Sequence, residues 1–157
     1  MIQRKQTLYL FFAGLITFIL LFIPLGHLST ELAYYKYTAF SVREATPDNT
    51  FIMSTVANAL LLIATSMLSI ITIFLYKNRK MQLKLTSMNM LVVLLAIFSI
   101  MYFYPNFIFG RNANLNGAII DYNYIILISF ISAIGLFLAK KAIAKDEAMV
   151  RSADRLR

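Results

Sequence analysis

Cysteine is absent from the 157 residues of this chain, and histidine occurs once, as His27. The chain therefore forms no disulfide and no thiolate metal site, and it does not belong to the four-helix membrane enzymes that exchange disulfides through cysteine pairs. A haem held between helices usually takes two axial ligands, one more than His27 supplies. The sequence predicts no cofactor and no metal site. We interpret His27 as a polar residue at the outer end of the first apolar segment, with a metal or proton role as the alternative.

Charged residues are also missing from four long apolar segments. Hydrophobic residues make up 60% of the chain, against about 45–50% in soluble domains, and a small soluble fold cannot bury that much apolar surface. A helix needs about 20 apolar residues to cross the hydrocarbon core of a bilayer. The four segments of about this length are 8–25, 51–76, 85–104 and 122–139.

The apolar residues in these segments are consecutive, as in Leu60–Ile63 and Leu91–Leu95, whereas a membrane β-barrel alternates them with polar residues. The sequence therefore predicts an all-α membrane protein. It would be a single domain, residues 1–157, with four transmembrane helices in an up-and-down arrangement. The connections would be the outer loops 26–50 and 105–121, the inner loop 77–84, and a tail, 140–157, that continues the fourth helix into the cytoplasm.

The basic residues indicate in which direction the helices cross. Of the 15 Lys and Arg residues, 12 lie in the N-terminal segment, the inner loop and the tail, and three, Lys36, Arg43 and Arg111, lie in the outer loops. Cytoplasmic flanks carry the excess of Lys and Arg in membrane proteins. We therefore expect both termini in the cytoplasm, and we attribute the net charge of +8 to this bias and not to nucleic-acid binding.

The outer loops contain patterns that are typical of short strands and turns. Residues Thr38–Val42 alternate in character, and Asn116-Gly117 is a favoured hairpin pair. We hypothesise that the two loops pair into a small cap on the outer surface of the membrane.

No ionisable residue lies inside the four segments, and such a residue is the usual mark of transport, proton relay or catalysis in a membrane. Motifs for zinc, nucleotide or serine-based chemistry are also missing from the sequence. For most of the remaining hydroxyls and amides, packing or bonding to their own helix is a sufficient explanation. Two interhelical polar contacts are predicted, at Asn58, whose amide needs a partner in lipid, and at Ser129, four residues before the small Ala133.

The tail is charged and adjoins the membrane, which is typical of a solvated helix end anchored to anionic headgroups. The alternative is a docking helix for a cytoplasmic partner or for the inner loop of another subunit. Arg151, Asp154 and Arg155 would then be the contact residues.

Both ends of the chain resemble those of a family of small bacterial inner-membrane proteins that carry a four-helix domain of unknown function. The residues concerned are Met1–Arg4, Gln6-Thr7 and Tyr9-Leu10 at the start and Lys145–Arg157 at the end. Lys5 departs from the apolar residue expected there. The resemblance implies four spans over the whole chain and supplies no catalytic or ligand-binding residues.

We therefore expect a non-enzymatic accessory or scaffold protein, multi-pass in the bacterial inner membrane. Its partners would be the lipid bilayer and, through protein contacts, another membrane or cytoplasmic protein or further copies of itself. Two alternatives stay open. One is a component of an oligomeric small transporter or channel in which several copies line a polar path. The other is a membrane enzyme that uses the outer-loop carboxylates Glu31, Glu44 or Asp48, for which surface solvation is the competing explanation.

Overall fold

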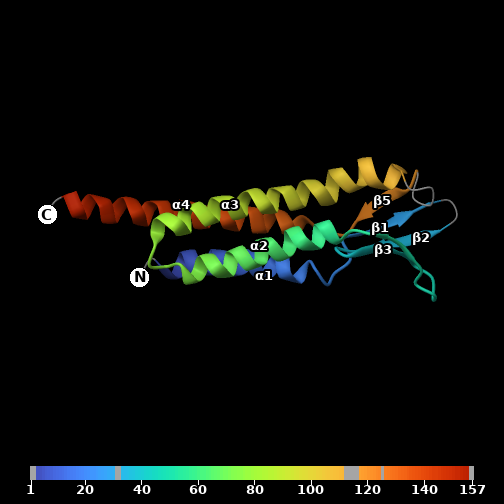
Figure 1. The fold of residues 1–157 in the computed structure, drawn as a ribbon, viewed down its shortest axis with the longest axis horizontal. Coiled ribbons are helices and arrows are strands. Elements are labelled where there is room, and N and C mark those ends of the chain that lie inside the picture. Colours follow the sequence, from blue (N-terminus) through green and yellow to red (C-terminus); the bar gives the residue numbers. More distant parts are fainter. Residues whose placement is uncertain (1–2, 31–32, 112–116, 125, 156–157) are drawn as a thin grey trace.

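A computed structural model describes residues 3–30, 33–111, 117–124 and 126–155. The molecule is elongated, with four long helices side by side, a β-sheet at one end and both chain termini at the other (Figure 1). The helices are α1 (Gln3–Ile19), α2 (Val56–Phe74), α3 (Arg79–Phe98) and α4 (Ile126–Arg155).

The sheet has five antiparallel strands in the order β4-β3-β2-β1-β5. Both predicted outer loops contribute to it, because β1 pairs with β5 from Gly26↔Tyr122 to Ser29↔Ile119. The predicted pairing of the two loops is thereby confirmed, and their place on the outer surface of a membrane stays a prediction. The strands are β1 (Gly26–Ser29), β2 (Tyr34–Tyr37), β3 (Ser41–Glu44), β4 (Phe51–Ser54) and β5 (Ile119–Tyr122).

The prediction of an all-α protein is wrong, since this sheet is part of the fold. Two strands account for the error at the helix ends: β4 begins the expected segment 51–76, and the last residue of β5, Tyr122, begins 122–139. Ile, Phe and Tyr are common in β-strands and also raise the hydropathy of a predicted transmembrane segment. Only the pairing of the loops decides between strand and helix at these positions.

The turn residues differ in detail from the expected pattern. Thr38 ends the strand that precedes it: its hydroxyl donates to the Ser41 carbonyl at 2.7 Å and accepts from the Ser41 N–H at 3.1 Å. Residues 38–40 therefore form the β2–β3 turn. Asn116 lies outside the described residues, and Gly117 has a φ of +75°, which the absence of a Cβ permits.

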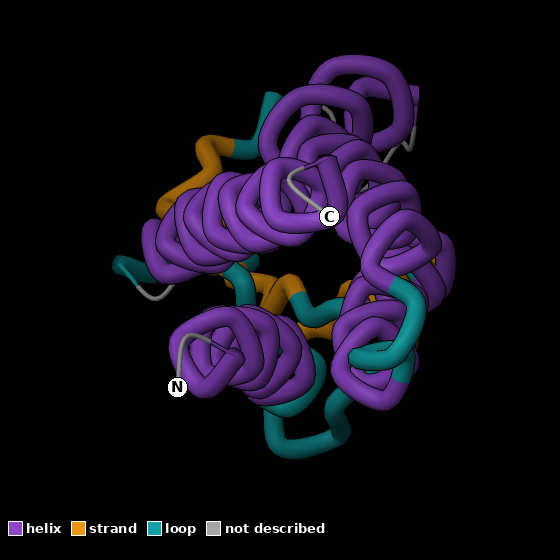
Figure 2. Tube along the Cα trace, turned by 90° about the vertical axis from the view of Figure 1, so that its left-hand side faces the viewer, coloured by secondary structure: helices purple, strands orange, loops and turns teal. Residues whose placement is uncertain are grey.

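The helices form a ring in which each packs against two neighbours: α1 against α2 and α4, and α3 against the same two (Figure 2). Their buried residues recur at alternating spacings of four and three, the heptad pattern of left-handed bundles. In α3 these are Gln82, Thr86, Asn89, Val93 and Ala96. The short connection between α2 and α3 makes them antiparallel neighbours, and the Asn78 side chain caps α3 by accepting from the Met81 N–H at 3.1 Å.

Beyond Phe98, α3 continues as a π-helix, η1 (Ser99–Ile108), and a 3₁₀ turn, η2 (Phe109–Arg111). Pro105 lies inside η1 and cannot donate a backbone hydrogen bond there. A wider turn accommodates the proline ring without ending the helix, so the chain stays regular until it reaches the level of the sheet.

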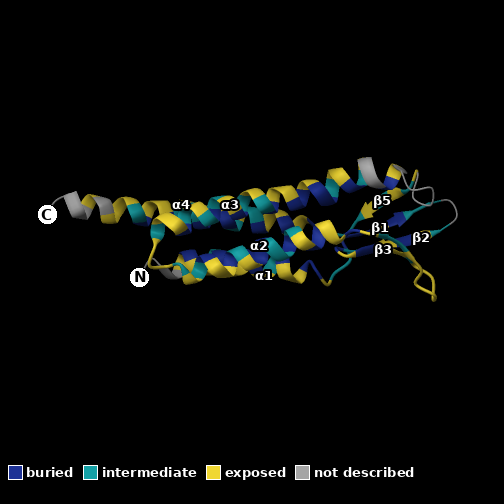
Figure 3. Ribbon diagram, viewed as in Figure 1, coloured by how far each residue is buried: buried dark blue, intermediate teal, exposed yellow. Residues whose placement is uncertain are grey.

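Large apolar side chains are exposed on the outside of the bundle, where Figure 3 shows exposed residues along the helices. Leu91, for example, is 63% exposed, and Phe22 and Phe74 are more exposed still. Within the described residues, three helices are long and apolar enough to cross a membrane: Val56–Phe74, Arg79–Asn106 and Ile126–Val150. The apolar helix Lys5–Ile19 is shorter.

Candidate functional site

A buried polar junction connects the sheet to the bundle. The Asn58 amide of α2 donates through Nδ2 to the Tyr37 hydroxyl of β2 at 2.6 Å, and its Oδ1 accepts from the Ser99 hydroxyl of η1 at 2.6 Å. Asn58 is fully buried. The residue that the sequence singles out for an interhelical contact therefore joins three elements. Ser129, the other, donates to the Ile126 carbonyl of its own helix.

Aromatic rings pack around the Tyr37 ring of this junction. The Tyr37 ring meets the Phe109 ring edge-to-face, with 5.3 Å between centroids, and lies 6.4 Å from the Tyr104 ring. Burial raises the pKa of Tyr37 above its ordinary value, and the nearby Tyr122 adds to the rise. Burial likewise raises the pKa of Tyr122, whose hydroxyl donates to the Met101 carbonyl at 3.0 Å. Both phenols therefore remain protonated at neutral pH, and they hold strand and helix together.

A second group of polar contacts lies in the middle of the bundle. The Asn89 amide of α3 donates to the Ser69 hydroxyl of α2 at 2.8 Å, and the Ser132 hydroxyl of α4 donates to the Ala13 carbonyl of α1 at 3.1 Å. Side-chain hydrogen bonds thus connect α2 with α3 and α1 with α4. Asn89 Oδ1 is buried and has no hydrogen-bond partner among the residues that the structure describes.

The third group, near the chain termini, contains a carboxylate that sequence reasoning missed. Asp146 of α4 is 5% exposed, and its Oδ2 accepts from the Gln6 amide of α1. Gln6 also donates to the Ala142 carbonyl at 3.2 Å, and Arg79 of α3 donates to the Asp146 backbone carbonyl at 3.0 Å. Within the described part of the chain, Asp146 Oδ1 is buried without a hydrogen-bond partner.

The signal for this burial was present in the sequence. Ser132, Leu136, Ala139, Ile143 and Asp146 are buried in turn at spacings of four and three. The heptad of α4 therefore continues past Ala139, the expected end of the fourth span, and Asp146 is a member of the bundle interior. The predicted solvated tail, 140–157, includes Asp146, so that prediction misses the burial of this carboxylate.

The predicted docking residues of the tail lie on the last part of α4, which runs to Arg155. The side chains of Arg151, Asp154 and Arg155 are outside the described part of the structure, so their role as contact residues stays a prediction. Helix α4 does extend beyond the other three helices at the end of the molecule where both termini lie (Figure 1).

The structure does not bring the outer-loop carboxylates together within its described residues. The Glu44 carboxylate accepts from the Thr50 hydroxyl at 2.7 Å, and Asp48 is exposed in the β3–β4 turn. Glu31 lies outside the described residues. His27 is exposed on β1, opposite Lys36 and Asp121 in the neighbouring strands. Among the residues that the structure describes, no group of three or more His, Cys, Asp or Glu side chains is placed to hold a metal ion.

In the described sheet β4 and β5 are the two edge strands, and the β5 edge presents apolar side chains. In the described chain, β5 pairs on one side only, with β1. Ile119 at its far end is 73% exposed, and Tyr124, which follows the strand, is 87% exposed. A β-strand with one unpaired edge is a template for pairing with another chain.

A search of curated proteins finds no match. The family described as Domain of unknown function (DUF4293) matches residues 2–156, nearly the whole chain. This confirms the resemblance to a family of unknown function that the two ends of the chain indicate. By this match, the protein belongs to the DUF4293 family.

Proposed function

We propose that this protein is a four-span component of the bacterial inner membrane that acts, without catalysis, as an accessory or scaffold protein. In this proposal both termini lie in the cytoplasm. The bundle holds the five-stranded sheet at the outer surface, and the sheet makes the protein contacts through which the molecule acts.

The arrangement of α1 supports a fourth span. Its apolar part, Lys5–Ile19, is short by itself, but α1 packs between α2 and α4. If its two neighbours cross the bilayer, α1 crosses beside them, and the apolar Leu20–Leu25 extend its path to the sheet. The end of the molecule that carries both termini and the α2–α3 connection also carries 12 of the 15 Lys and Arg residues, which favours the cytoplasm for that end.

The exposure of Ile119 is the observation that carries the proposal. Ile119 lies three residues before Tyr122, whose hydroxyl contacts the bundle. At about 3.4 Å per residue, it stands roughly 10 Å farther along β5 from this contact. In this proposal the sheet lies outside the bilayer, so a large apolar side chain at that end of β5 faces water and not lipid. On an unpaired edge strand, it is placed to contact an added strand from a partner protein.

Site-specific photocrosslinking in intact cells tests this function. A photoreactive amino acid in place of Ile119 should give one or a few discrete protein adducts, because a strand pairs with a defined partner. The same amino acid in place of Leu91, which is also exposed but faces lipid in this proposal, is the control and should give no protein adduct. An adduct with a second copy or with another protein supports the proposal. Equal labelling at both positions, or none at Ile119, contradicts it.

One observation favours the transporter or channel alternative. The bundle interior carries a line of polar side chains, Gln82, Thr86 and Asn89 on α3, and Asn89 Oδ1 is buried without a partner. An unpaired acceptor such as Asn89 Oδ1 could bind a polar solute that moves along this line of side chains. Since four helices enclose too little space for a sizeable pore, this function requires an oligomer. Mass measurement of the protein in lipid nanodiscs discriminates the two, because a strict monomer counts against the transporter.

A further inference from the structure

Two cations face each other on the exposed side of the sheet. Lys36 of β2 and Arg43 of β3 are directly paired residues of adjacent strands. Like charges in this position destabilise a sheet. Neither side chain forms an ion pair within the described structure, and Arg43 donates through Nε to the Ser41 hydroxyl at 3.3 Å. Of the three basic residues in the outer loops, two are therefore held together with no anion beside them.

A hollow of about 380 Å³ lies at this pair. Hydroxyl and amide groups surround the two cations on the sheet side, and apolar side chains complete the hollow where α1 ends. The lining residues other than Lys36 and Arg43 are Thr38, Ser41 and Asn49 on the polar side and Leu21, Phe22 and Phe40 on the apolar side.

The nearby carboxylates do not neutralise the pair. Glu44 is not among the residues that line the hollow, and its carboxylate accepts from the Thr50 hydroxyl; Asp121 is two strands away from Lys36. With about 4.8 Å between strands, that distance is roughly 10 Å. Asp48 adjoins Asn49 in the β3–β4 turn and is exposed to solvent. The hollow therefore has a net positive charge.

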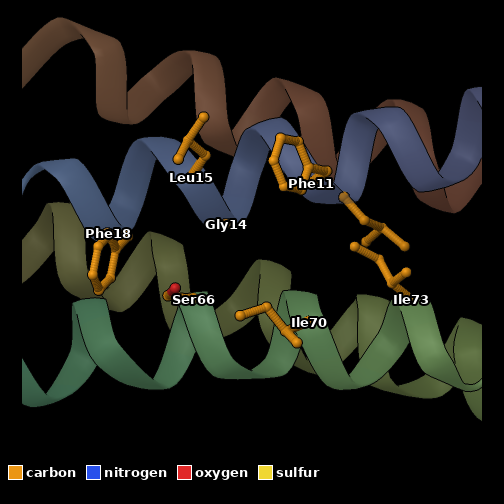
Figure 4. Close-up of a pocket in the computed structure, with 8 residues that line it drawn as sticks. Phe11, Gly14, Leu15, Phe18, Ser66, Ile70 and Ile73 are labelled. Carbon is orange, nitrogen blue, oxygen red and sulfur yellow. The ribbon is translucent and has the colours of Figure 1, made fainter.

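An apolar groove leads from this hollow down the bundle. It lies between α1 and α2, has a volume of about 200 Å³, and has Phe11, Phe18, Gly14 and Ile70 among its lining residues (Figure 4). The Phe18 ring meets the Phe22 ring edge-to-face at 5.3 Å, so the groove and the hollow adjoin. Phe11 to Phe18 spans about 10 Å along the helix, most of the roughly 15 Å thickness of one hydrocarbon leaflet.

We propose that this combined surface binds one anionic glycerophospholipid of the leaflet on the sheet side. The lipid phosphate lies between Lys36 and Arg43, and one acyl chain lies in the α1–α2 groove. The charge selects an anionic headgroup, and the depth of the groove selects a ligand that already resides in the bilayer. This inference rests on the proposed orientation of the four spans, and it adds a lipid partner to a function that was argued from protein contacts.

Quenching of a single tryptophan by brominated lipids tests the site directly. The chain contains no tryptophan, so Phe40→Trp places one fluorophore in the hollow, and Leu15→Trp places one in the groove. Each full-length variant is reconstituted in phosphatidylcholine vesicles that contain brominated phosphatidylglycerol or brominated phosphatidylcholine. Two cations at a headgroup should favour the anionic lipid by roughly 30-fold, and salt should weaken this preference.

Substitution of the cations separates a site from general surface charge. Added to either tryptophan variant, Lys36→Gln with Arg43→Gln should abolish the preference, and Lys36→Arg with Arg43→Lys should retain it. Lys80→Gln with Lys84→Gln removes the same charge from the first turns of α3, at the end of the bundle away from the sheet, and should leave the preference unchanged.

Several results would overturn the inference. Equal quenching by the two lipids, or a preference that survives Lys36→Gln with Arg43→Gln, rules out the site while leaving the four-span proposal intact. Loss of the preference on addition of inorganic phosphate at constant ionic strength assigns the hollow to a soluble anion instead. If no brominated lipid quenches either tryptophan, the bilayer is not where these residues lie, and the four-span proposal fails with the lipid site.

Discussion

The bundle and the sheet place their polar side chains on opposite sides. In the bundle, Leu91 and Phe74 face outward while Thr65, Ser69 and Asn89 are fully buried. In the sheet, Leu28, Tyr37 and Val42 are fully buried, and the exposed face carries His27, Lys36, Arg43 and Asp121. In the proposed four-span arrangement, the surface of each region matches the solvent that it would contact, lipid for the bundle and water for the sheet.

This difference also shows what holds each region together. Helices in lipid gain no hydrophobic free energy by meeting, so small side chains and hydrogen bonds bring them into contact. The sheet buries an apolar face against the bundle end and uses backbone pairing along its strands. The boundary between the two regions uses burial and side-chain hydrogen bonds together. It is a buried cluster of Tyr37, Asn58 and Ser99, which are joined by hydrogen bonds.

The largest effect is expected at this boundary. Asn58→Ala removes both hydrogen bonds and leaves the buried hydroxyls of Tyr37 and Ser99 without their partner, which should lower the free energy of unfolding by about 3 kcal/mol. Denaturation of the detergent-solubilised protein, followed by circular dichroism, measures this. Asn106→Ala, which removes an exposed amide, is the control and should cost less than about 0.5 kcal/mol. Similar losses for the two variants would mean that the junction does not couple the regions.

High pH should weaken the sheet before the bundle. Because burial raises the pKa of Tyr37 above 10, the folded protein holds this proton more tightly than the unfolded chain does. Its contribution to stability is complete below about pH 10 and is lost as the pH rises further toward the folded-state pKa. We expect the free energy of unfolding to fall by up to ~1.4 kcal/mol per pH unit above pH 10 for this phenol.

Comparison of two tyrosine variants from the same strand isolates this term. Tyr37→Phe should flatten the decline of stability above pH 10, and the raised pKa of Tyr122 accounts for part of the slope that remains. Tyr34→Phe, at an exposed position of β2, should leave the decline unchanged. Stability measured between pH 9 and pH 12 gives both slopes, and equal slopes in the two variants would refute the assignment to Tyr37.

Close helix contact in the bundle can be probed at two glycines. A Cβ at Gly14 would lie 2.9 Å from the Ser69 Cβ, whereas a Cβ at Gly135 meets its nearest neighbour at 3.6 Å. Gly14→Ala should therefore lower the free energy of unfolding by about 1–2 kcal/mol through overpacking of the α1–α2 contact. Gly135→Ala should be neutral or raise it by up to about 1 kcal/mol, because alanine favours the helix. A stable Gly14→Ala would show that the two helices separate easily.

The smallest effect concerns the cation pair. Lys36→Gln with Arg43→Gln removes two like charges that face each other, so the free energy of unfolding should rise by about 0.5 kcal/mol in detergent without anionic lipid. Thermal unfolding of this variant beside the parent protein measures the change. A clear loss of stability would mean that the two cations hold the sheet together by themselves, which weakens the argument that they are kept for a ligand.

Part of this arrangement could be predicted from local sequence and part could not. The apolar segments and the short inner connection follow from composition along the chain, since hydropathy adds residue by residue. The β1–β5 pairing joins residues about 90 positions apart, and no local pattern contains that information. Apolarity therefore predicts Phe51–Ser54 and Tyr122 as the starts of helices, and residues 119–121 fall in the predicted outer loop 105–121.

The sequence by itself determined that most of the chain is apolar helix, and its uneven distribution of Lys and Arg determined the orientation that we propose. Tertiary structure alone decided that the outer loops form one sheet, that Asp146 is buried against Gln6, and that Lys36 and Arg43 face each other above the end of α1. The reason is physical. Burial in lipid depends on the composition of a segment, whereas pairing, burial of a charge and the shape of a site depend on which distant segments meet.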